Sequence, residues 1–242
     1  MSKLFKILSA ALLLIAFNSC EKEPVDNPTD EEPPVEKYER YVKGSRFRSD
    51  ILEEQLTYTL FMPASYETDT LKRYPVVYFL HGIGESSTKD WTEYMKTIES
   101  LEDNGLQEMI YVFPNGYSSY YCNTFDGKFR YMDMFIQELV PHIDATFRTK
   151  ADRQYRAVTG YSMGGFGTAA LALKNPDVFG MSAPMSISLC TDKRYLSESQ
   201  DGWENQWGRI FGGIGQRGEG RLTDYYKEHC PFYQFTPENK DR

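Results

Sequence analysis

A serine between two glycines is the part of this sequence best suited to chemistry. The pattern is G-x-S-x-G and comprises Gly160, Tyr161, Ser162, Met163 and Gly164. It separates an apolar run at 155–159 from the Ala- and Leu-rich run 166–174, which predicts a strand, a sharp turn and a helix. Such a turn lifts a serine hydroxyl above the edge of a sheet. We interpret Ser162 as a nucleophile for acyl transfer, with a helix-capping serine as the alternative.

A second motif could stabilise the negative charge that forms when such a serine attacks a carbonyl. His81, Gly82, Ile83 and Gly84 directly follow the apolar run 75–80. A loop at this place supplies one backbone N–H of an oxyanion hole, and the residue after the serine supplies the other. We therefore expect the donors to be the N–H groups of Ile83 and Met163. Because His81 precedes the serine, we expect it to support the loop and not to act as the base.

The general base that should activate Ser162 is harder to find. His229 is the only histidine after the serine, and it lies where a helix is expected to end, a position that the helix dipole alone favours. His142 lies beside an apolar helical stripe and is expected on the helix surface. The later carboxylates do not follow a strand as a triad acid should; they are Asp177, Asp192, Asp201 and Asp224.

The elements that must position these residues alternate along the chain. Strands are predicted at 56–62, 75–80, 109–113, 155–159 and 181–189, and helices at 90–106, 135–147 and 166–174. The first strand alternates apolar and polar residues, as in a half-exposed antiparallel strand, whereas 75–80 and 109–113 are continuously apolar, as in buried parallel strands. Pro141 should kink the second helix. This order predicts an α/β fold with a mostly parallel sheet and helices on both faces.

Composition narrows the classes of function. The 242 residues carry a formal net charge of -8 and show no basic stripe, which argues against a nucleic-acid partner. Three histidines with no metal-binding spacing predict no metal, and we expect no cofactor. Three cysteines of the domain, Cys122, Cys190 and Cys230, are an odd number, so at least one stays a free thiol.

The N-terminal residues indicate export. Two lysines precede an apolar stretch that ends at Cys20, and this resembles a bacterial lipoprotein signal over residues 1–19. The resemblance implies cleavage before Cys20, a lipid on its sulfur, and attachment to a membrane of the cell envelope, either periplasmic or at the outer surface. An ordinary secretory signal or an uncleaved anchor is the alternative. Residues 20–37 are rich in proline and carboxylates and are expected to form a disordered tether, so that one domain spans 38–242.

The motifs together resemble the putative esterase D family, which includes feruloyl and acetylxylan esterases of carbohydrate esterase family 1. The similar segments are PVVYFLHGIGESSTKDW at 75–91, VFPNG at 112–116, LVPHID at 139–144 and YRAVTGYSMGGFG at 155–167. The resemblance implies an α/β-hydrolase fold, a Ser162 nucleophile, and an oxyanion hole at Ile83 and Met163. It also implies that the loop 115–129 lines the substrate pocket, for which His81, Tyr117 and Tyr121 are the candidates.

This sequence departs from that family at its C-terminal end. Family members continue into a further strand and a loop that carry the triad aspartate and histidine, so we expect the α/β-hydrolase domain to be incomplete here. Three hypotheses follow: a serine esterase acting on small-molecule or polysaccharide esters, a catalytically silent surface lipoprotein that binds glycan, and an acyltransferase of the same fold. The esterase is favoured because a strained serine turn is costly to keep without use.

Overall fold

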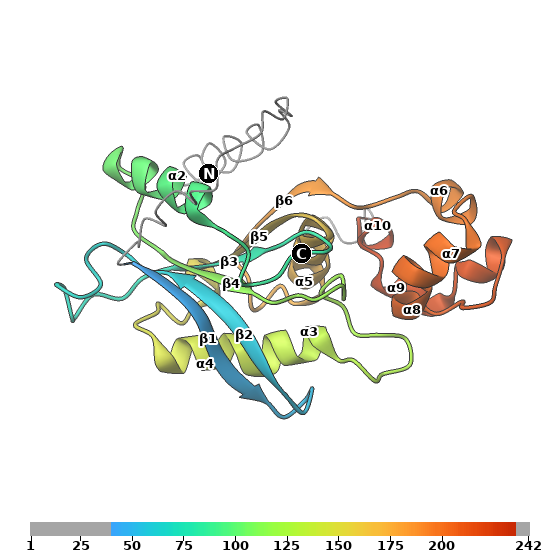
Figure 1. Cartoon of the computed structure of the whole chain (residues 1–242), viewed down its shortest axis with the longest axis horizontal. Helices are drawn as coiled ribbons and strands as arrows, with labels where there is room; N and C mark the ends of the chain where they lie inside the picture. Colours follow the sequence, from blue (N-terminus) through green and yellow to red (C-terminus); the bar gives the residue numbers. More distant parts are fainter. Residues whose placement is uncertain (1–39, 236–242) are drawn as a thin grey trace, which may run out of the picture.

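The computed structural model describes residues 40–235, and its centre is one six-stranded sheet of order β1-β2-β4-β3-β5-β6 (Figure 1). The strands are β1 (Tyr41–Ser49), β2 (Glu54–Phe61), β3 (Val76–Leu80), β4 (Ile110–Pro114), β5 (Arg156–Ser162) and β6 (Met181–Ile187). β3, β4, β5 and β6 are parallel, and the β1–β2 hairpin joins antiparallel at β4. The predicted signal at 1–19, Cys20 and the tether at 20–37 lie outside the described residues.

Helices cover both faces of the sheet, as the alternation of buried side chains requires. Val77 and Phe79 of β3 face α2 (Thr92–Asp103), whereas Val76, Tyr78 and Leu80 face the other side. That other side holds α3 (Tyr131–Met134), η1 (Phe135–Leu139), α4 (Val140–Thr146) and α5 (Met163–Lys174). Both faces of the central strands are therefore dry, which explains their continuous apolar runs.

The predicted helix at 135–147 is longer and less regular than expected. It runs through α3, η1 and α4, and η1 is a π-helical segment that ends just before Pro141. Proline has no N–H to donate and its ring crowds the preceding turn, so a helix that continues through it must change its hydrogen-bond pattern. The irregularity therefore starts before the proline.

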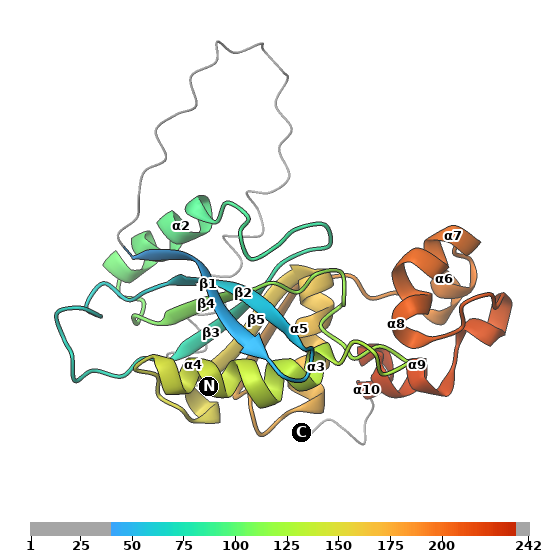
Figure 2. The same cartoon turned by 60° about the horizontal axis from the view of Figure 1, so that its bottom comes forward.

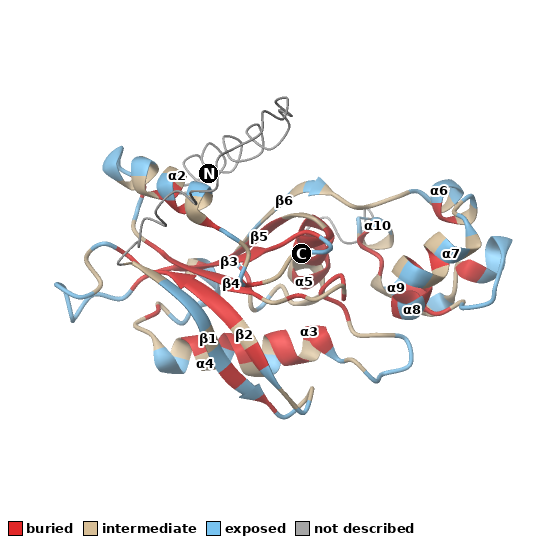
Figure 3. Ribbon diagram, in the orientation of Figure 1, coloured by how far each residue is buried: buried red, intermediate tan, exposed pale blue. Residues whose placement is uncertain are grey.

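A group of short helical elements follows β6 beyond the carboxyl ends of the strands (Figures 1 and 2). They are α6 (Asp192–Leu196), α7 (Gln200–Gly202), η3 (Trp203–Gly208), α8 (Arg209–Phe211), η4 (Gly218–Arg221), α9 (Asp224–His229) and α10 (Pro231–Gln234). The buried residues of this group, coloured red in Figure 3, are mostly aromatic. Arg221 is buried among them and donates hydrogen bonds to the carbonyls of Tyr195 (3.0 Å) and Glu198 (2.7 Å). No helix within residues 40–235 is long and apolar enough to cross a bilayer.

Candidate active site

Ser162 lies at a sharp turn between β5 and α5. Its backbone angles are φ 55° and ψ -117°, in the left-handed half of conformational space that non-glycine residues avoid. The glycines of the pentapeptide are there for space, because a Cβ on Gly160 or on Gly164 would overlap the Leu80 carbonyl oxygen. The turn therefore packs directly against the end of β3, and this packing maintains the strained conformation of Ser162.

The two expected oxyanion donors follow the ends of paired strands. Leu80 of β3 pairs with Gly160 of β5, so the loop after β3 and the turn after β5 lie side by side at one edge of the sheet. Met163 opens α5, where backbone N–H groups have no partner inside the helix. Within residues 40–235 the Ile83 N–H also has no acceptor. Two unpaired donors therefore lie at the edge that presents Ser162.

His81 is fully buried and uses both of its ring nitrogens for structure. Nε2 accepts the Gly116 N–H at 2.8 Å, which leaves the proton on Nδ1, and Nδ1 donates to the Gly82 carbonyl at 2.7 Å. Burial lowers the pKa of His81 and keeps the ring neutral. His81 ties the loop after β3 to the loop after β4, and it has no nitrogen left to take a proton from Ser162.

A carboxylate connects the loop after β3 to the serine turn. Glu85 accepts the Gly82 N–H at 3.0 Å and the hydroxyl of Tyr161, the residue before Ser162. Lys89 completes this group, which we name the Glu85 cluster, with its Nζ 2.5 Å from the Glu85 carboxylate and 2.7 Å from the Tyr161 hydroxyl. Burial alone would raise the pKa of Glu85, but hydrogen bonds from Lys89, Tyr161 and Gly82 outweigh it and lower the pKa. Glu85 lies in the family-like segment 75–91, but no residue spacing in the sequence indicates that it bonds to Tyr161.

The loop after β4 is strained and tightly packed. Tyr117, Tyr120 and Tyr121 have φ of 51°, 55° and 59°. Tyr121 is fully buried, and its hydroxyl donates to the His81 carbonyl at 3.1 Å. Its ring also occupies the space that a Cβ on Gly116 or Gly167 would need.

The predicted substrate-pocket role has to be corrected for two residues. His81 and Tyr121 are each 0% exposed, so neither presents surface to a ligand. Both instead fix the shape of the loops around the serine. Tyr117 is half-buried and lines a cavity, as described below.

Neither of the other two histidines contacts Ser162. His142 Nε2 is 2.9 Å from the Tyr58 hydroxyl, and its ring stacks on Phe47. His229 Nδ1 is 2.9 Å from the Tyr225 carbonyl oxygen, and the two rings stack with centroids 3.9 Å apart. Burial lowers the pKa of both. The three histidines of the sequence are therefore all engaged away from the serine.

One of the carboxylates that follow Ser162 has partners of its own. Asp192, at the start of α6, accepts the hydroxyls of Tyr226 at 3.1 Å and of Tyr233 at 2.5 Å. Within the described residues no group of three or more His, Cys, Asp or Glu could hold a metal ion. Cys122, Cys190 and Cys230 are free thiols.

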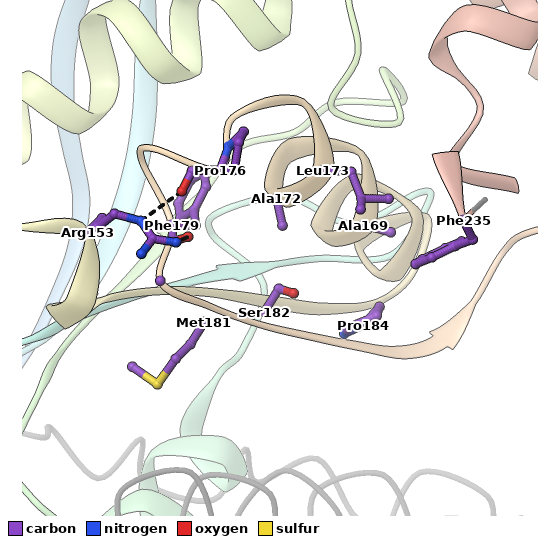
Figure 4. Close-up of a pocket in the computed structure, with 11 residues that line it drawn as sticks. Arg153, Ala169, Ala172, Leu173, Pro176, Phe179, Met181, Ser182, Pro184 and Phe235 are labelled. Carbon is purple, nitrogen blue, oxygen red and sulfur yellow. Dashed lines mark hydrogen bonds between the residues drawn. The ribbon is translucent and has the colours of Figure 1, made fainter. Parts of the chain in front are cut away.

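The part of the chain at 40–235 encloses cavities of a size that could take a ligand, and two of them bear on the site. One, of about 280 Å³, lies between α5, the start of β6 and Phe235, toward the amino end of β6 and thus away from Ser162 (Figure 4). The other, of about 530 Å³, lies between the start of β2, the loop after β4 and α8, and Tyr117 lines it. It is at the carboxyl edge of the sheet, where sheets of this type bind their ligands.

A mostly parallel sheet covered on both faces, with a strained serine turn after β5 and backbone donors beside it, is the architecture of an α/β-hydrolase. Solved structures share this fold: a serine hydrolase from Staphylococcus aureus, named as fluorophosphonate-binding and substrate bound, aligns with a TM-score of 0.60 at 24% identity over 80% of this chain and 71% of that one. A ferulic acid esterase aligns with a TM-score of 0.54 at 31% identity over 57% of this chain and 56% of that one.

Residues 49–233 match the pattern of the family described as putative esterase, and the chain therefore belongs to that family. An endo-1,4-beta-xylanase/feruloyl esterase of Xylanibacter ruminicola is 33% identical over 144 residues, which are 55% of this chain and 20% of that protein. Esterase Rv1288 of Mycobacterium tuberculosis is 32% identical over 136 residues, 53% of this chain and 28% of that protein. The chain thus spans about a quarter of the length of the curated relatives that it matches.

Proposed function

We propose that this protein is a serine carboxylic-ester hydrolase. Ser162 Oγ attacks the ester carbonyl, and the N–H groups of Ile83 and Met163 bind the resulting oxyanion. The ester C–O bond then breaks and the alcohol leaves with the serine proton. Water attacks the acyl-serine in turn, which releases the carboxylic acid and restores the serine hydroxyl. The observation that carries the proposal is the strained φ of 55° at Ser162, because such strain costs about 1–3 kcal/mol and clusters at functional sites.

The substrates that we propose are acyl esters of polysaccharides, with feruloyl or acetyl as the acyl group. The support comes from two relatives, one named as an endo-1,4-beta-xylanase/feruloyl esterase and one as a ferulic acid esterase. We also propose that Cys20 carries a lipid that holds the domain at the cell envelope, where such polysaccharides are met. Mass spectrometry of the mature protein, purified from membranes, should then show a lipidated cysteine at its N-terminus; an unmodified chain that begins elsewhere would contradict the anchor.

One observation favours a second function, a silent protein that binds glycan in the same cleft. No histidine of the sequence hydrogen-bonds Ser162, and a serine hydroxyl is a weak nucleophile without an adjacent base. The strained turn would then be an inherited feature that positions the cleft walls.

The test compares the protein with its Ser162→Ala variant. An esterase should hydrolyse p-nitrophenyl acetate and methyl ferulate in a serine-dependent manner, and a fluorophosphonate should label Ser162 covalently. The Ser162→Ala variant should lose both signals while keeping its melting temperature. Equal rates in the two proteins, with no fluorophosphonate label, would reject the serine as nucleophile and leave the silent binder.

A further inference from the structure

The 530 Å³ cavity has the size of a site for a small ligand, since such sites measure about 300–1,000 Å³. Its walls come from three separate parts of the chain. Lining residues with polar or charged side chains include Glu54, Ser118, Thr124, Asp126, Lys128 and Arg209. Aromatic and apolar surface comes from Tyr117, Phe129 and Ile210.

Two aromatic rings form a corner of this cavity. Tyr117 and Phe129 meet edge to face, with centroids 5.7 Å apart and planes at 86°. Tyr117 is fixed in its left-handed conformation, and its N–H donates to Asn115 Oδ1 at 3.2 Å. A ring held in this way offers a flat apolar face at little entropic cost to a ligand that stacks on it.

The opposite wall is fixed to the aromatic one. Arg209 of α8 donates to the Ser118 carbonyl, and the Phe125 N–H donates to the Ile210 carbonyl at 2.7 Å. Deeper in the molecule, the Tyr120 ring packs on Trp207 with centroids 4.3 Å apart. The cavity is therefore formed before any ligand arrives.

The charges around the cavity select for an uncharged ligand. Glu54 and Asp126 are balanced by Lys128 and Arg209, so the site has no net charge. Asp126 and Lys128 already pair at 3.5 Å, whereas Glu54 and Arg209 form no ion pair within residues 40–235. A carboxylate accepts hydrogen bonds and a guanidinium donates them, so these two side chains match a ligand rich in hydroxyl groups.

The cavity is offset from the serine. Tyr117 follows β4, Ser162 ends β5, and β3 lies between these two strands. Two strand spacings correspond to about 10 Å. A ligand in the cavity therefore lies beside the reacting ester and not on it.

We propose that this cavity is a saccharide subsite that holds a neutral sugar residue next to the one that carries the ester. The sugar ring stacks in the corner of Tyr117 and Phe129, and its hydroxyls donate to Glu54 and accept from Arg209. This inference rests on the proposed polysaccharide esterase function for its place in catalysis. The binding itself does not depend on any bond being broken.

Isothermal titration calorimetry on the full chain tests the binding with neutral tetrasaccharides of xylose, glucose and mannose. At least one should bind, and Tyr117→Ala, Glu54→Gln and Arg209→Ala should each weaken it by about tenfold, which corresponds to about 1.4 kcal/mol. Arg194→Ala, an exposed arginine of α6 outside the cavity, is the matched control and should bind like the parent protein. Ser162→Ala should also bind like the parent.

Several outcomes would overturn the subsite. They are no binding of any neutral tetrasaccharide, binding of only the charged tetragalacturonate, or binding that Arg209→Ala and Glu54→Gln leave intact. Arg209→Ala also removes the hydrogen bond to the Ser118 carbonyl, whereas Glu54→Gln keeps the size of the side chain, so the melting temperature of each variant is measured to show whether it folds. Serine-dependent ester hydrolysis without saccharide binding refutes the subsite alone. If the parent protein binds a saccharide, the cavity variants do not, and no serine-dependent hydrolysis is seen, the subsite is supported and the esterase function is refuted.

Discussion

The two halves of the proposed catalytic machinery are built to very different degrees. On the oxyanion side, Ser162 is strained and His81 and Glu85 hold the neighbouring loop. N–H groups with no acceptor among residues 40–235 lie at the same sheet edge. On the base side, His142 and His229 bond to Tyr58 and Tyr225 and not to the serine. The expected oxyanion donors are positioned by two neighbouring strands, β3 and β5, whose ends lie side by side. Neither strand end carries a side chain that could act as the base.

The largest effect expected from this contrast is a slow enzyme that a free base can rescue. Without a histidine on Ser162, only binding and the oxyanion hole contribute, which leaves about 10³–10⁴-fold catalysis over water. We expect p-nitrophenyl acetate turnover by the chain to lie several orders of magnitude below that of a ferulic acid esterase relative measured beside it. Added imidazole should raise the rate in the parent protein above the rise seen in Ser162→Ala, which corrects for direct hydrolysis by imidazole. Rates equal to the relative without imidazole would mean that His81 or His229 acts as the base.

The serine turn itself should tolerate no added bulk. A Cβ on Gly164 would overlap the Leu80 carbonyl group and approach the His81 carbonyl oxygen, and these backbone atoms cannot move aside as a flexible side chain could. Gly164→Ala should therefore lower the free energy of unfolding by about 3 kcal/mol and abolish fluorophosphonate labelling. Gly105→Ala is the matched control, since its φ is +93° with open space around it, and strain alone should cost about 1 kcal/mol. Equal losses in urea titrations of the two variants would show that the contact with β3 is unimportant.

His81 should contribute to stability in a manner that depends on pH. His81→Ala leaves the buried Gly116 N–H without its acceptor, at a cost of about 1–3 kcal/mol at pH 7.5. Burial lowers the pKa of His81 below its ordinary value of 6.5. Just below pH 6.5 the unfolded chain therefore binds a proton at this residue and the folded chain does not, so acid favours unfolding. The parent protein should therefore lose stability as the pH falls below 6.5, and His81→Ala should lose less. A variant as sensitive to acid as the parent would refute the neutral buried ring.

The Glu85 cluster should matter for rate more than for stability. Direct loss of an oxyanion donor costs about 10²–10³-fold in kcat, and a residue that only positions the loop should cost less. We expect Glu85→Gln to lower kcat about tenfold with little change in KM. Glu93→Gln, an exposed glutamate on α2, is the control and should change neither parameter. A rise in KM with kcat intact would assign Glu85 to substrate binding.

The smallest effect is expected at His229. Its ring stacks on Tyr225 in α9 and touches no part of the serine turn. His229→Gln should change serine-dependent hydrolysis by less than twofold, and steady-state kinetics with p-nitrophenyl acetate measure this. A loss of a hundredfold or more would identify His229 as the base, and the site would then have both its oxyanion donors and its base.

The sequence allowed the strands and the serine turn to be predicted because their signals are local. Continuous apolar runs mark the buried strands β3 and β4, and glycine spacing marks the turn at Ser162. The sheet and its helices on both faces were predicted correctly, and the structural relatives confirm the α/β-hydrolase fold.

Other features depend on contacts between residues distant in sequence. The edge strand β1 was missed because most of its residues, including Lys43, Arg46 and Arg48, are exposed and its pattern is not apolar. The link from Glu85 to Tyr161 spans 76 residues and no spacing rule announces it. The burial of Tyr121 likewise depends on Gly116 of its own loop and on Gly167 of α5.

Those glycines have an evolutionary consequence. The Tyr121 ring fills the space of two absent side chains, at Gly116 and Gly167, so the three positions form one steric unit. A side chain at either glycine is compatible with the fold only after the tyrosine has been replaced by something smaller, and the smaller residue alone leaves a void. Each single step is therefore unfavourable although the combined change is not, and such epistasis should keep these three residues together wherever this loop is used.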